Sequence, residues 1–290
     1  MSDRLLVSTR KGLFTVSRKS REWAISAVYF LGDNVSVTLF DRRDGRCYAA
    51  LDHGHFGVKA PSLNSDRLGG DCRPRLSAKP DGYEEADVLG RPLDRSTARI
   101  WALESGGLDQ PGVIWCGTLP GGLFRSTDHG QSWEMMRALW DHPKRKQWSA
   151  GGADLPGLHS ICIDPRSSQR VWVAVSTGGI WFTEDGGASW TQRGNGMRAE
   201  YVPPEMAHDP VAQDVHRLSN VRQHHSACGY NIITVSSSPP MKAGHSRRSR
   251  ASNPRASVLP LSFIRASPTR HGLFLRSRMR SVPHRRASLS

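Results

Sequence analysis

The chain of 290 residues carries 40 Lys and Arg against 26 Asp and Glu, a formal net charge of +14, and is long enough to bury a sizeable core. Thirteen of the basic residues and no acidic residue lie in residues 219–290, so residues 1–218 are close to neutral. The excess charge therefore belongs to the C-terminal segment, which argues against a folded part that binds nucleic acid or an anionic membrane.

The cysteines are odd in number and include no Cys-x-x-Cys pair, which favours reduced thiols over a disulfide framework or a zinc site. They are Cys47, Cys72, Cys116, Cys162 and Cys228. No apolar run near the N-terminus resembles a signal peptide, and none elsewhere approaches the roughly 20 residues of a membrane span. We therefore expect a soluble, cytoplasmic protein with no membrane partner.

Two strand pairs are predicted in the N-terminal part of the chain. Residues 5–9 (LLVST) are an apolar, β-rich run, and Gly12-Leu13-Phe14 follows after a short turn. Residues 47–50 (CYAA) and 55–58 (HFGV) form a second, weaker version of the same arrangement. Short β-rich runs separated by turns predict antiparallel hairpins.

An internal repeat lies further along the chain. Residues 114–133 (IWCGTLPGGLFRSTDHGQSW) align without a gap with residues 171–190 (VWVAVSTGGIWFTEDGGASW), at an offset of 57. Each copy predicts an apolar strand, a turn that contains Gly, a second short strand and a polar turn that ends in Trp.

The polar turns follow the pattern Ser/Thr-x-Asp-x-Gly-x-Ser-Trp. An Asp at the third position can accept hydrogen bonds from backbone N–H groups two residues on and so hold a tight turn. The Gly supplies a conformation that a Cβ would oppose, and the Trp can fold over the turn. We expect structural, not catalytic, roles for Ser126, Asp128, Gly130 and Trp133 in the first turn, and for Thr183, Asp185, Gly187 and Trp190 in the second.

This pattern resembles the Asp box, or BNR repeat, of sialidase-like propellers, sortilin-like receptors and bacterial cytosolic BNR proteins that are often labelled exo-α-sialidase. The resemblance covers most of residues 1–218 and implies an all-β fold, a β-propeller of which about four blades are visible. Because such propellers usually close with more blades, residues 1–218 are expected to form an incomplete propeller domain. Residues 219–290 are expected to form a basic, disordered tail.

The resemblance also implies a sialidase-like activity, which the residues support less well. Sialidases of this kind use an arginine cluster for the substrate carboxylate, a Tyr activated by Glu as nucleophile and an Asp as acid/base. Arg198, Glu200 and Tyr201 match these residue types. Neighbours on one strand point to opposite faces, however, so Glu200 is not expected to activate Tyr201. The Arg-Ile-Pro signature of the first arginine is also missing, so the resemblance supports the fold more than the activity.

The long connections that follow the two repeats gather ionisable and aromatic residues, as a binding site at the mouth of a propeller channel needs. The alternative is that these residues belong to ordinary solvated loops. The candidate pocket consists of His142, Asp154, His159, Arg198, Glu200, Tyr201 and His216. Asp154 and Glu200 are the candidates for a hydrolase with paired carboxylates. The spacing of the three histidines matches no reliable metal-ligand pattern, so neither a metal nor another cofactor is predicted.

Two segments have the composition of GC-rich coding DNA read in the wrong frame. From Val221 to Gly244, reading from each third base permits AAAPQRMWVQHHNGIFVSSDEGR, which contains the strand, Gly turn and Asp box again. The possible codons of residues 254–275, read in a shifted frame, can encode SGFGFAVVVHPREPDTAWFVPA. Those of residues 60–79, read from each second base, can encode LHRSTATDWEEIAAPAYPP. Our hypothesis is two compensating frame lesions near positions 60 and 79 and one uncorrected lesion near 219. The alternative is a natural insertion and a natural disordered tail.

Three functional hypotheses remain open. The preferred one is a cytosolic propeller that binds a small molecule, a glycan or a protein through its channel-mouth loops. The second is a sialidase-like glycoside hydrolase. The third is a truncated product without function, because missing blades leave strand edges exposed. A specific nucleic-acid partner is not expected, because the basic tail lacks interleaved aromatic residues for stacking on bases.

Overall fold

The computed structural model describes residues 3–52, 58–59, 62–64, 82–84, 92, 96–149, 155–194 and 196–218, with the backbone alone at 58–59 and 62–64. Three expectations fall mainly outside this part of the chain. The predicted tail, residues 219–290, and the candidate pocket residue Asp154 lie outside the described residues, and only residues 62–64 of the segment 60–79 lie inside them.

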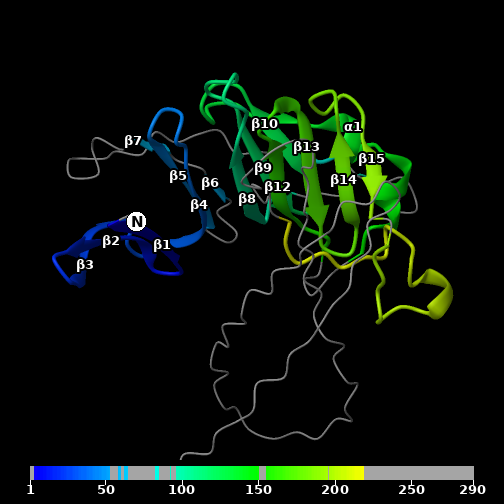
Figure 1. Ribbon diagram of the computed structural model, residues 1–290, viewed down its shortest axis with the longest axis horizontal. Coiled ribbons are helices and arrows are strands. Elements are labelled where there is room, and N and C mark those ends of the chain that lie inside the picture. Colours follow the sequence, from blue (N-terminus) through cyan, green and yellow to red (C-terminus); the bar gives the residue numbers. More distant parts are fainter. Residues whose placement is uncertain are drawn as a thin grey trace, which may run out of the picture.

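Four antiparallel sheets follow one another along the chain (Figure 1). Their strands are β1 (Arg4–Thr9), β2 (Gly12–Lys19) and β3 (Glu22–Tyr29) in the first sheet; β4 (Asn34–Phe40), β5 (Arg46–Asp52), β6 (Val58–Lys59) and β7 (Ser62–Asn64) in the second; β8 (Arg99–Ser105), β9 (Ile114–Leu119), β10 (Leu123–Ser126) and β11 (Glu134–Met135) in the third; and β12 (Leu158–Asp164), β13 (Ser167–Val175), β14 (Gly179–Thr183) and β15 (Thr191–Arg193) in the fourth.

The sheets are arranged as the blades of a β-propeller. In the first, third and fourth sheets each strand pairs with the next one along the chain; in the second, β6 and β7 both pair with β5. The first strands of successive sheets contact one another, β1 with β4, β4 with β8 and β8 with β12. Sheets joined along their first strands are the blades of a propeller. We number them blades 1 to 4 and call β1, β4, β8 and β12 the inner strands.

The chain is therefore an all-β protein with an incomplete propeller. The first predicted strand pair, residues 47–50 of the second pair and both repeat copies are present as strands. Of the predicted run 55–58, only Val58 lies within the described residues, at the start of β6. Helical structure in the described residues is short: α1 (Arg137–Trp140) and two 3₁₀ turns, Pro143–Gln147 and Pro204–Met206. No helix among the described residues is long and apolar enough to cross a membrane.

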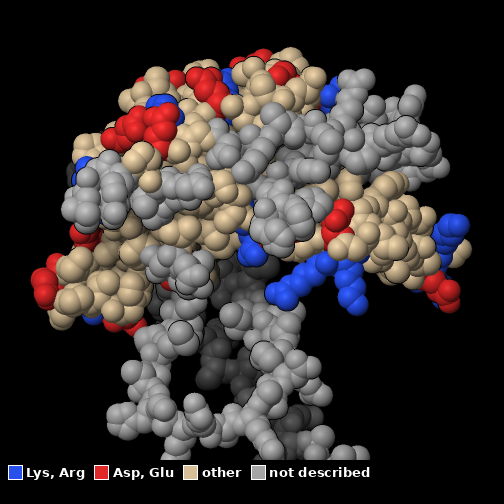
Figure 2. Space-filling view, turned by 180° about the vertical axis from the view of Figure 1, so that it is seen from behind, with Lys and Arg blue, Asp and Glu red and all other residues tan. Residues whose placement is uncertain are grey.

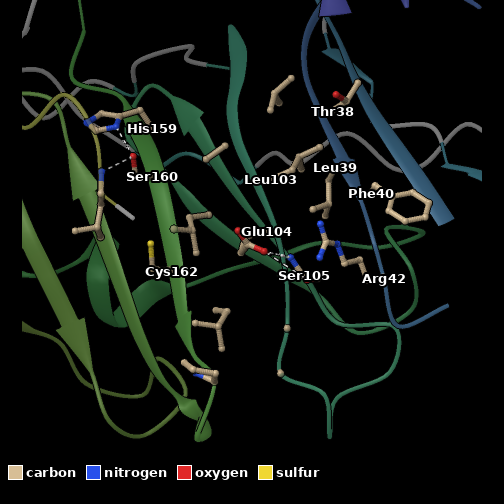
Figure 3. A pocket seen from close by; sticks show the side chains of 18 of the residues that line it. Thr38, Leu39, Phe40, Arg42, Leu103, Glu104, Ser105, His159, Ser160 and Cys162 are labelled. Atoms are coloured by element: carbon tan, nitrogen blue, oxygen red, sulfur yellow. Dashed lines mark hydrogen bonds between the residues drawn. The ribbon is translucent and has the colours of Figure 1, made fainter. Parts of the chain in front are cut away.

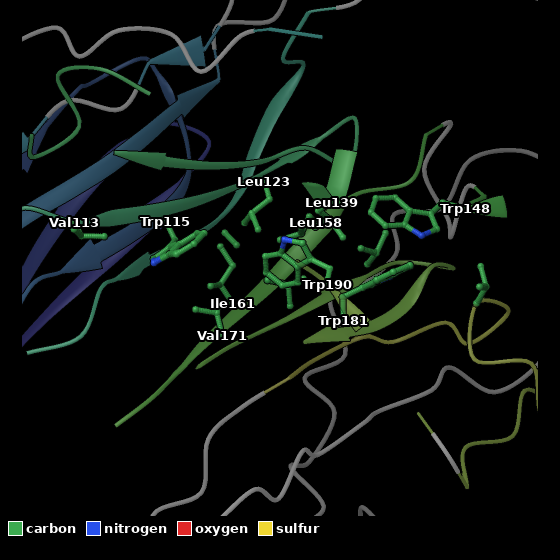
Figure 4. Close-up of a cluster of buried hydrophobic side chains, with 14 residues drawn as sticks. Val113, Trp115, Leu123, Leu139, Trp148, Leu158, Ile161, Val171, Trp181 and Trp190 are labelled. Carbon is green, nitrogen blue, oxygen red and sulfur yellow. The ribbon is translucent and has the colours of Figure 1, made fainter. Parts of the chain in front are cut away.

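The largest core lies between blades 3 and 4 (Figure 4). Trp115 of β9 and Trp181 of β14 are almost completely buried there, together with Leu158 of the inner strand β12. β14 is buried along its whole length, as expected for a strand with a packed surface on each side. The apolar positions of the repeat therefore serve to pack one blade on the next.

The two repeated polar turns connect β10 to β11 and β14 to β15, at the edge of each blade that is farthest from the inner strand. In the second turn, Asp185 accepts hydrogen bonds from the Ser189 N–H (2.9 Å) and the Ser189 hydroxyl (2.5 Å). The Thr183 hydroxyl donates to Asp185 (2.6 Å) and accepts from the Gly187 N–H (3.0 Å). Trp190 is buried, and its Nε1 donates to the carbonyl of Gly187 (3.2 Å).

The first turn repeats this network. Asp128 accepts from the N–H (2.9 Å) and the hydroxyl (2.6 Å) of Ser132, and the Ser126 hydroxyl accepts from the Gly130 N–H (2.7 Å). Trp133 is half-buried against the core between blades 2 and 3. One expectation is corrected: each carboxylate bonds the N–H four residues on, not two. The hydroxyl of Ser126 or Thr183 bonds the nearer N–H groups, which leaves the carboxylate to span the turn.

Candidate functional site

A cavity of about 650 Å³ lies against the inner strands β4, β8 and β12 (Figure 3). Residues 37–40 of β4, 101–105 of β8 and 159–163 of β12 line it, and Arg217 and Leu218 border it. Because the inner strands of a propeller surround its axis, this cavity occupies the channel side of blades 2 to 4. Concave spaces of this size are typical of ligand sites.

The lining of the cavity combines three arginines with one carboxylate. Arg42 follows β4 and is exposed, as is Arg217, whereas Glu104 on β8 is half-buried (Figure 3). Burial raises the pKa of Glu104, although its carboxylate accepts hydrogen bonds from the Ser105 N–H (3.0 Å) and hydroxyl (3.4 Å). The cavity therefore carries a local excess of positive charge.

Arg43, the third arginine of the lining, is committed to structure. Its guanidinium forms a bidentate pair with the fully buried Asp41 (2.8 and 2.5 Å). It also donates to the carbonyls of Gly107 (3.1 Å), Gln110 (2.6 Å) and Val113 (2.7 Å) in blade 3. Burial alone would raise the pKa of Asp41, but Arg43 outweighs it and holds that pKa below its usual value. Arg43 thus clamps blade 2 to blade 3.

His159 is the predicted pocket residue that lines the cavity, and it lies on the inner strand β12 instead of a loop. Its Nδ1 is 2.8 Å from the hydroxyl of Ser160, which in turn accepts from the Leu218 N–H (3.2 Å). Burial lowers the pKa of His159, so its imidazole is neutral near pH 7. The residue can therefore offer a neutral donor or acceptor to a ligand.

Arg198, Glu200 and Tyr201 lie outside the cavity lining, in an irregular segment after β15. Arg198 pairs with Glu200 at 3.2 Å, and the Tyr201 hydroxyl donates to the carbonyl of Ala212. The argument from strand alternation does not apply, because this segment is not a strand. Burial, followed by the charge of Asp214, raises the pKa of Tyr201, which is the opposite of what a nucleophile needs.

The remaining predicted histidines are also held elsewhere. His142 caps the 3₁₀ turn Pro143–Gln147 through a bond from the Lys144 N–H (3.2 Å), and its ring packs edge-on against Trp181. His216 contacts Asp214 at 3.3 Å. Within the part of the chain that the structure describes, no group of three or more His, Cys, Asp or Glu side chains could hold a metal ion.

Sequence reasoning missed Glu104 on the inner strand β8 and Arg42, which follows the inner strand β4. The available signal was the repeat period: His159 and His216 are 57 residues apart, the offset of the two repeats. Each repeat copy begins within the second strand of its blade, so the strand before it in the sequence is the inner strand. Locating that strand would have identified the residues on the channel side of the blade.

No protein-family model matches the chain. An oligoxyloglucan-reducing end-specific xyloglucanase of Emericella nidulans is 36% identical over 78 residues, which are 27% of this chain and 8% of that protein. The structure of the GH74 xyloglucanase of Xanthomonas campestris aligns with a TM-score of 0.42 at 18% identity, over 65% of this chain and 27% of that one. The structure described as YCF48 bound to D1 peptide aligns with a TM-score of 0.44 at 12% identity, over 76% and 55% of the two chains.

These proteins are similar to this chain in part only. The chain spans 8% of the length of the curated xyloglucanase it matches, so that protein's activity does not transfer with the alignment. The BNR and sialidase assignments stay predictions.

Proposed function

We propose that this protein binds a ligand or a protein partner in the cavity on the channel side of blades 2 to 4. The observation that carries the proposal is the cavity itself, about 650 Å³ and lined by three successive inner strands. A rigid sheet framework that presents polar side chains to a concave space favours binding without a large reorganisation.

The charge of the lining favours an anionic ligand. Asp41 neutralises Arg43, but Arg42 and Arg217 are exposed at the cavity. Glu104 is the one carboxylate among the described lining residues, so the two exposed arginines are opposed by a single acidic side chain. A carboxylate-bearing glycan or an acidic peptide would meet two arginine forks suited to bidentate contacts.

The test is a binding screen of acidic and neutral oligosaccharides and peptides, followed by calorimetric titration of the hits. Arg42→Ala and Arg217→Ala should each weaken binding of an anionic ligand about tenfold, and added salt should weaken it further. Lys146→Ala is the matched control, because Lys146 is exposed and does not line the cavity. If the arginine variants and the control bind alike, the cavity is not the site.

A glycoside hydrolase is the second candidate, favoured by the raised pKa of Glu104 in the cavity and by the local similarity to xyloglucanases. Such enzymes use two carboxyl groups on either side of the bond that is cleaved. Glu104 is the one carboxylate among the described lining residues, so the second would have to come from elsewhere. Release of reducing ends from xyloglucan oligosaccharides or of sialic acid from a sialoside, lost in Glu104→Gln, would support this candidate. Turnover unaffected by that change would exclude Glu104.

A further inference from the structure

Residues 214–218 lie against the inner strand β12 at one border of the cavity, and we call them the strap. Val215 and Leu218 of the strap are buried in one cluster with Cys162 of β12. Arg217 and Leu218 belong to the lining of the cavity, and so does Cys162. The strap therefore forms part of the cavity wall and helps to cover the Cys162 side chain.

The chain immediately before the strap is anchored to a different part of blade 4. The Gln213 carbonyl accepts a hydrogen bond from the Gly179 N–H (3.2 Å) at the start of β14. The side-chain amide of Gln213 donates to the carbonyls of Ala207 (3.0 Å) and Asp209 (2.8 Å). These bonds fix the chain up to Gln213 without using β12.

The strap itself is held on β12 by two buried apolar side chains, Val215 and Leu218, and by a backbone hydrogen bond. In this bond the Leu218 N–H donates to the Ser160 hydroxyl (3.2 Å). A short segment can open locally while the blade stays folded, because local opening costs only a fraction of the global free energy of unfolding. The strap is thus suited to a local transition at the cavity.

His159 determines how Ser160 can hold the strap. The pairing of β12 with β13 shifts between Leu158 and Ser160, so His159 is the extra residue of a β-bulge, a feature that redirects side chains. Its Nδ1 lies 2.8 Å from the Ser160 hydroxyl (Figure 3). Because the hydroxyl oxygen accepts the Leu218 N–H, we assign the hydroxyl proton to Nδ1 and the imidazole hydrogen to Nε2. This is the neutral tautomer of His159.

Protonation of His159 removes the acceptor that Ser160 uses. An imidazolium donates from both nitrogens, so the Ser160 hydroxyl would face two donors and its own proton would lose its acceptor at Nδ1. Ser160 is buried, and a buried donor without an acceptor is costly. The hydrogen-bond chain from His159 through Ser160 to Leu218 is therefore compatible with a neutral imidazole and strained by a charged one.

The strap also supplies charges that act on His159. Burial is the largest cause that lowers the pKa of His159, and the positive charges of His216 and Arg217 lower it further. The carbonyl of Val215 and the charge of Asp214 raise it, but they do not outweigh burial. Two of the strap's side chains therefore oppose a charge on His159 while the strap is closed.

Other titratable groups lie near the cavity and on the surface. The remaining charged side chains of the lining, on β8 and after β4, are Glu104, Arg42 and Arg43. Acidic side chains are also spread over the described surface (Figure 2), but exposed carboxyl groups ordinarily titrate near about pH 4, below the range of a histidine. Burial raises the pKa of Glu104, so an experiment must separate its protonation from that of His159.

The direction of the pH effect follows from the two states of the strap. The pKa of His159 is lowered from 6.5 when the strap is closed, whereas an exposed imidazole keeps its ordinary value. The open form therefore binds a proton more readily, so the closed strap keeps its full stability above pH 6.5 and loses it as the pH falls below that value. Each pH unit in this range shifts the equilibrium by at most about tenfold, until the pKa of the closed form is reached.

We propose that His159 acts as a pH-sensitive latch: when its imidazole is protonated, the strap leaves β12, the cavity opens at Leu218, and Arg217 is withdrawn from the lining. The release itself needs no ligand. Its consequence for binding, the loss of the Arg217 contact to an anion, rests on the proposed function of the cavity. The latch and the proposed function can therefore fail separately.

The experiment follows the Cys162 thiol in the full chain, because the closed strap helps to cover it. The protein is treated with 4,4′-dithiodipyridine between pH 7.5 and pH 5, and modification of the peptide that contains Cys162 is measured by mass spectrometry. Each rate is divided by the rate of glutathione at the same pH, which removes the intrinsic pH dependence of a thiol. The normalised rate should rise at least about fivefold as the pH falls from 7.5 to 5.

His159→Asn is the matched variant, since the Asn side-chain oxygen can accept from Ser160 in place of Nδ1 but cannot be protonated in this range. Its normalised rate should stay constant, and because Glu104 is still present, a constant rate also excludes Glu104 as the cause. Cys116 is fully buried in the core between blades 2 and 3 and reports on unfolding of the blades. It should remain slow at every pH.

A constant rate in the parent, an equal rise in His159→Asn or a parallel rise at Cys116 would overturn the proposal. Ser160→Ala gives a second test: it removes the acceptor of the Leu218 N–H, so Cys162 should react at least about threefold faster than in the parent at pH 7.5. A rate equal to that of the parent would show that Ser160 does not hold the strap, and the latch would fail with it. If the release is found but Arg217→Ala binds anionic ligands as the parent does, the latch stands and the proposed function fails.

Discussion

Replacing Asp185 with Asn tests whether the repeated turns act through the charge of their carboxylate. The Asp185 carboxylate accepts from the Ser189 N–H, the Ser189 hydroxyl and the Thr183 hydroxyl, at 2.9, 2.5 and 2.6 Å. These bonds, led by the one from the Ser189 hydroxyl, lower the pKa of Asp185 from 3.8 to about 2. Asn keeps one acceptor oxygen and the shape of the side chain, so the substitution removes mainly the charge.

The expected loss of stability is about 1 kcal/mol at neutral pH. The shift in pKa corresponds to roughly 2.5 kcal/mol, and we take less than half of it because the side chain is exposed and solvent screens its charge. Because the pKa is lower in the folded state, the stabilisation is complete above about pH 4 and is lost as the pH falls through 3.8 towards 2. Asp185→Ala should cost more, about 2 kcal/mol, because all three donors lose their acceptor.

The assay is urea unfolding followed by tryptophan fluorescence, because Trp190 covers this turn. The difference between the parent and Asp185→Asn should be full at pH 7 and reduced to roughly half at pH 3, because pH 3 lies between the unfolded and folded pKa values. Glu184→Gln is the control: the neighbouring residue is exposed and forms a surface pair with Arg170 at 3.4 Å, which contributes little. A difference that persists unchanged at pH 3, or an equal loss in the control, would refute the electrostatic account of the turn.

Four further predictions use the same chain. Arg43→Ala should lower the free energy of unfolding by about 3–5 kcal/mol by leaving the buried Asp41 carboxylate alone, whereas Arg42→Ala should change it by less than about 0.5 kcal/mol, both measured by urea unfolding. Gly179→Ala should cost more than about 2 kcal/mol, because φ is +73° and a Cβ would lie 2.0 Å from the Pro210 carbonyl oxygen. Cys47 is buried and its pKa is raised to about 11, so it should resist iodoacetamide at pH 8 until urea unfolds the protein. Resequencing codons 55–85 and 210–250 should give a corrected gene sequence from which the frame lesions are absent. An unchanged sequence would show that the chain is encoded as printed.

The blade framework could be predicted from the sequence because the signals are local. The Gly and Asp of each turn occupy fixed offsets, and the backbone conformation at Gly187 (φ +102°) follows from chain geometry that short sequences encode. The β-rich apolar runs and the 57-residue offset between the two repeat copies then locate the strands on either side of each turn. What the motif did not fix was the hydrogen-bond assignment, since carboxylate and hydroxyl acceptors compete for the same N–H groups.

The cavity was less accessible to sequence reasoning because no local motif marks an inner strand. Glu104, Arg42 and His159 come from three blades and meet only after the blades pack. The sequence argument instead chose Arg198, Glu200 and Tyr201 by residue type in one long connection, where the structure places an exposed ion pair and a tyrosine bonded to backbone. Residue types that suit catalysis are common on solvated surfaces, so type without geometry selects poorly.

The separation of motif from cavity has a physical reason in the topology of a blade. The repeated turn joins the third and fourth strands, and the cavity lies along the first, so substitutions at Asp128 or Asp185 affect folding without touching a ligand. Inner-strand residues such as Glu104 line the cavity, and the backbone pairing of the strand does not depend on the identity of their side chains. A motif that folding requires therefore identifies the architecture, while binding chemistry depends on positions that the motif does not specify. For this chain, we propose that function should be sought at Glu104 on the inner strand β8 and at the exposed arginines of the cavity lining, Arg42 and Arg217.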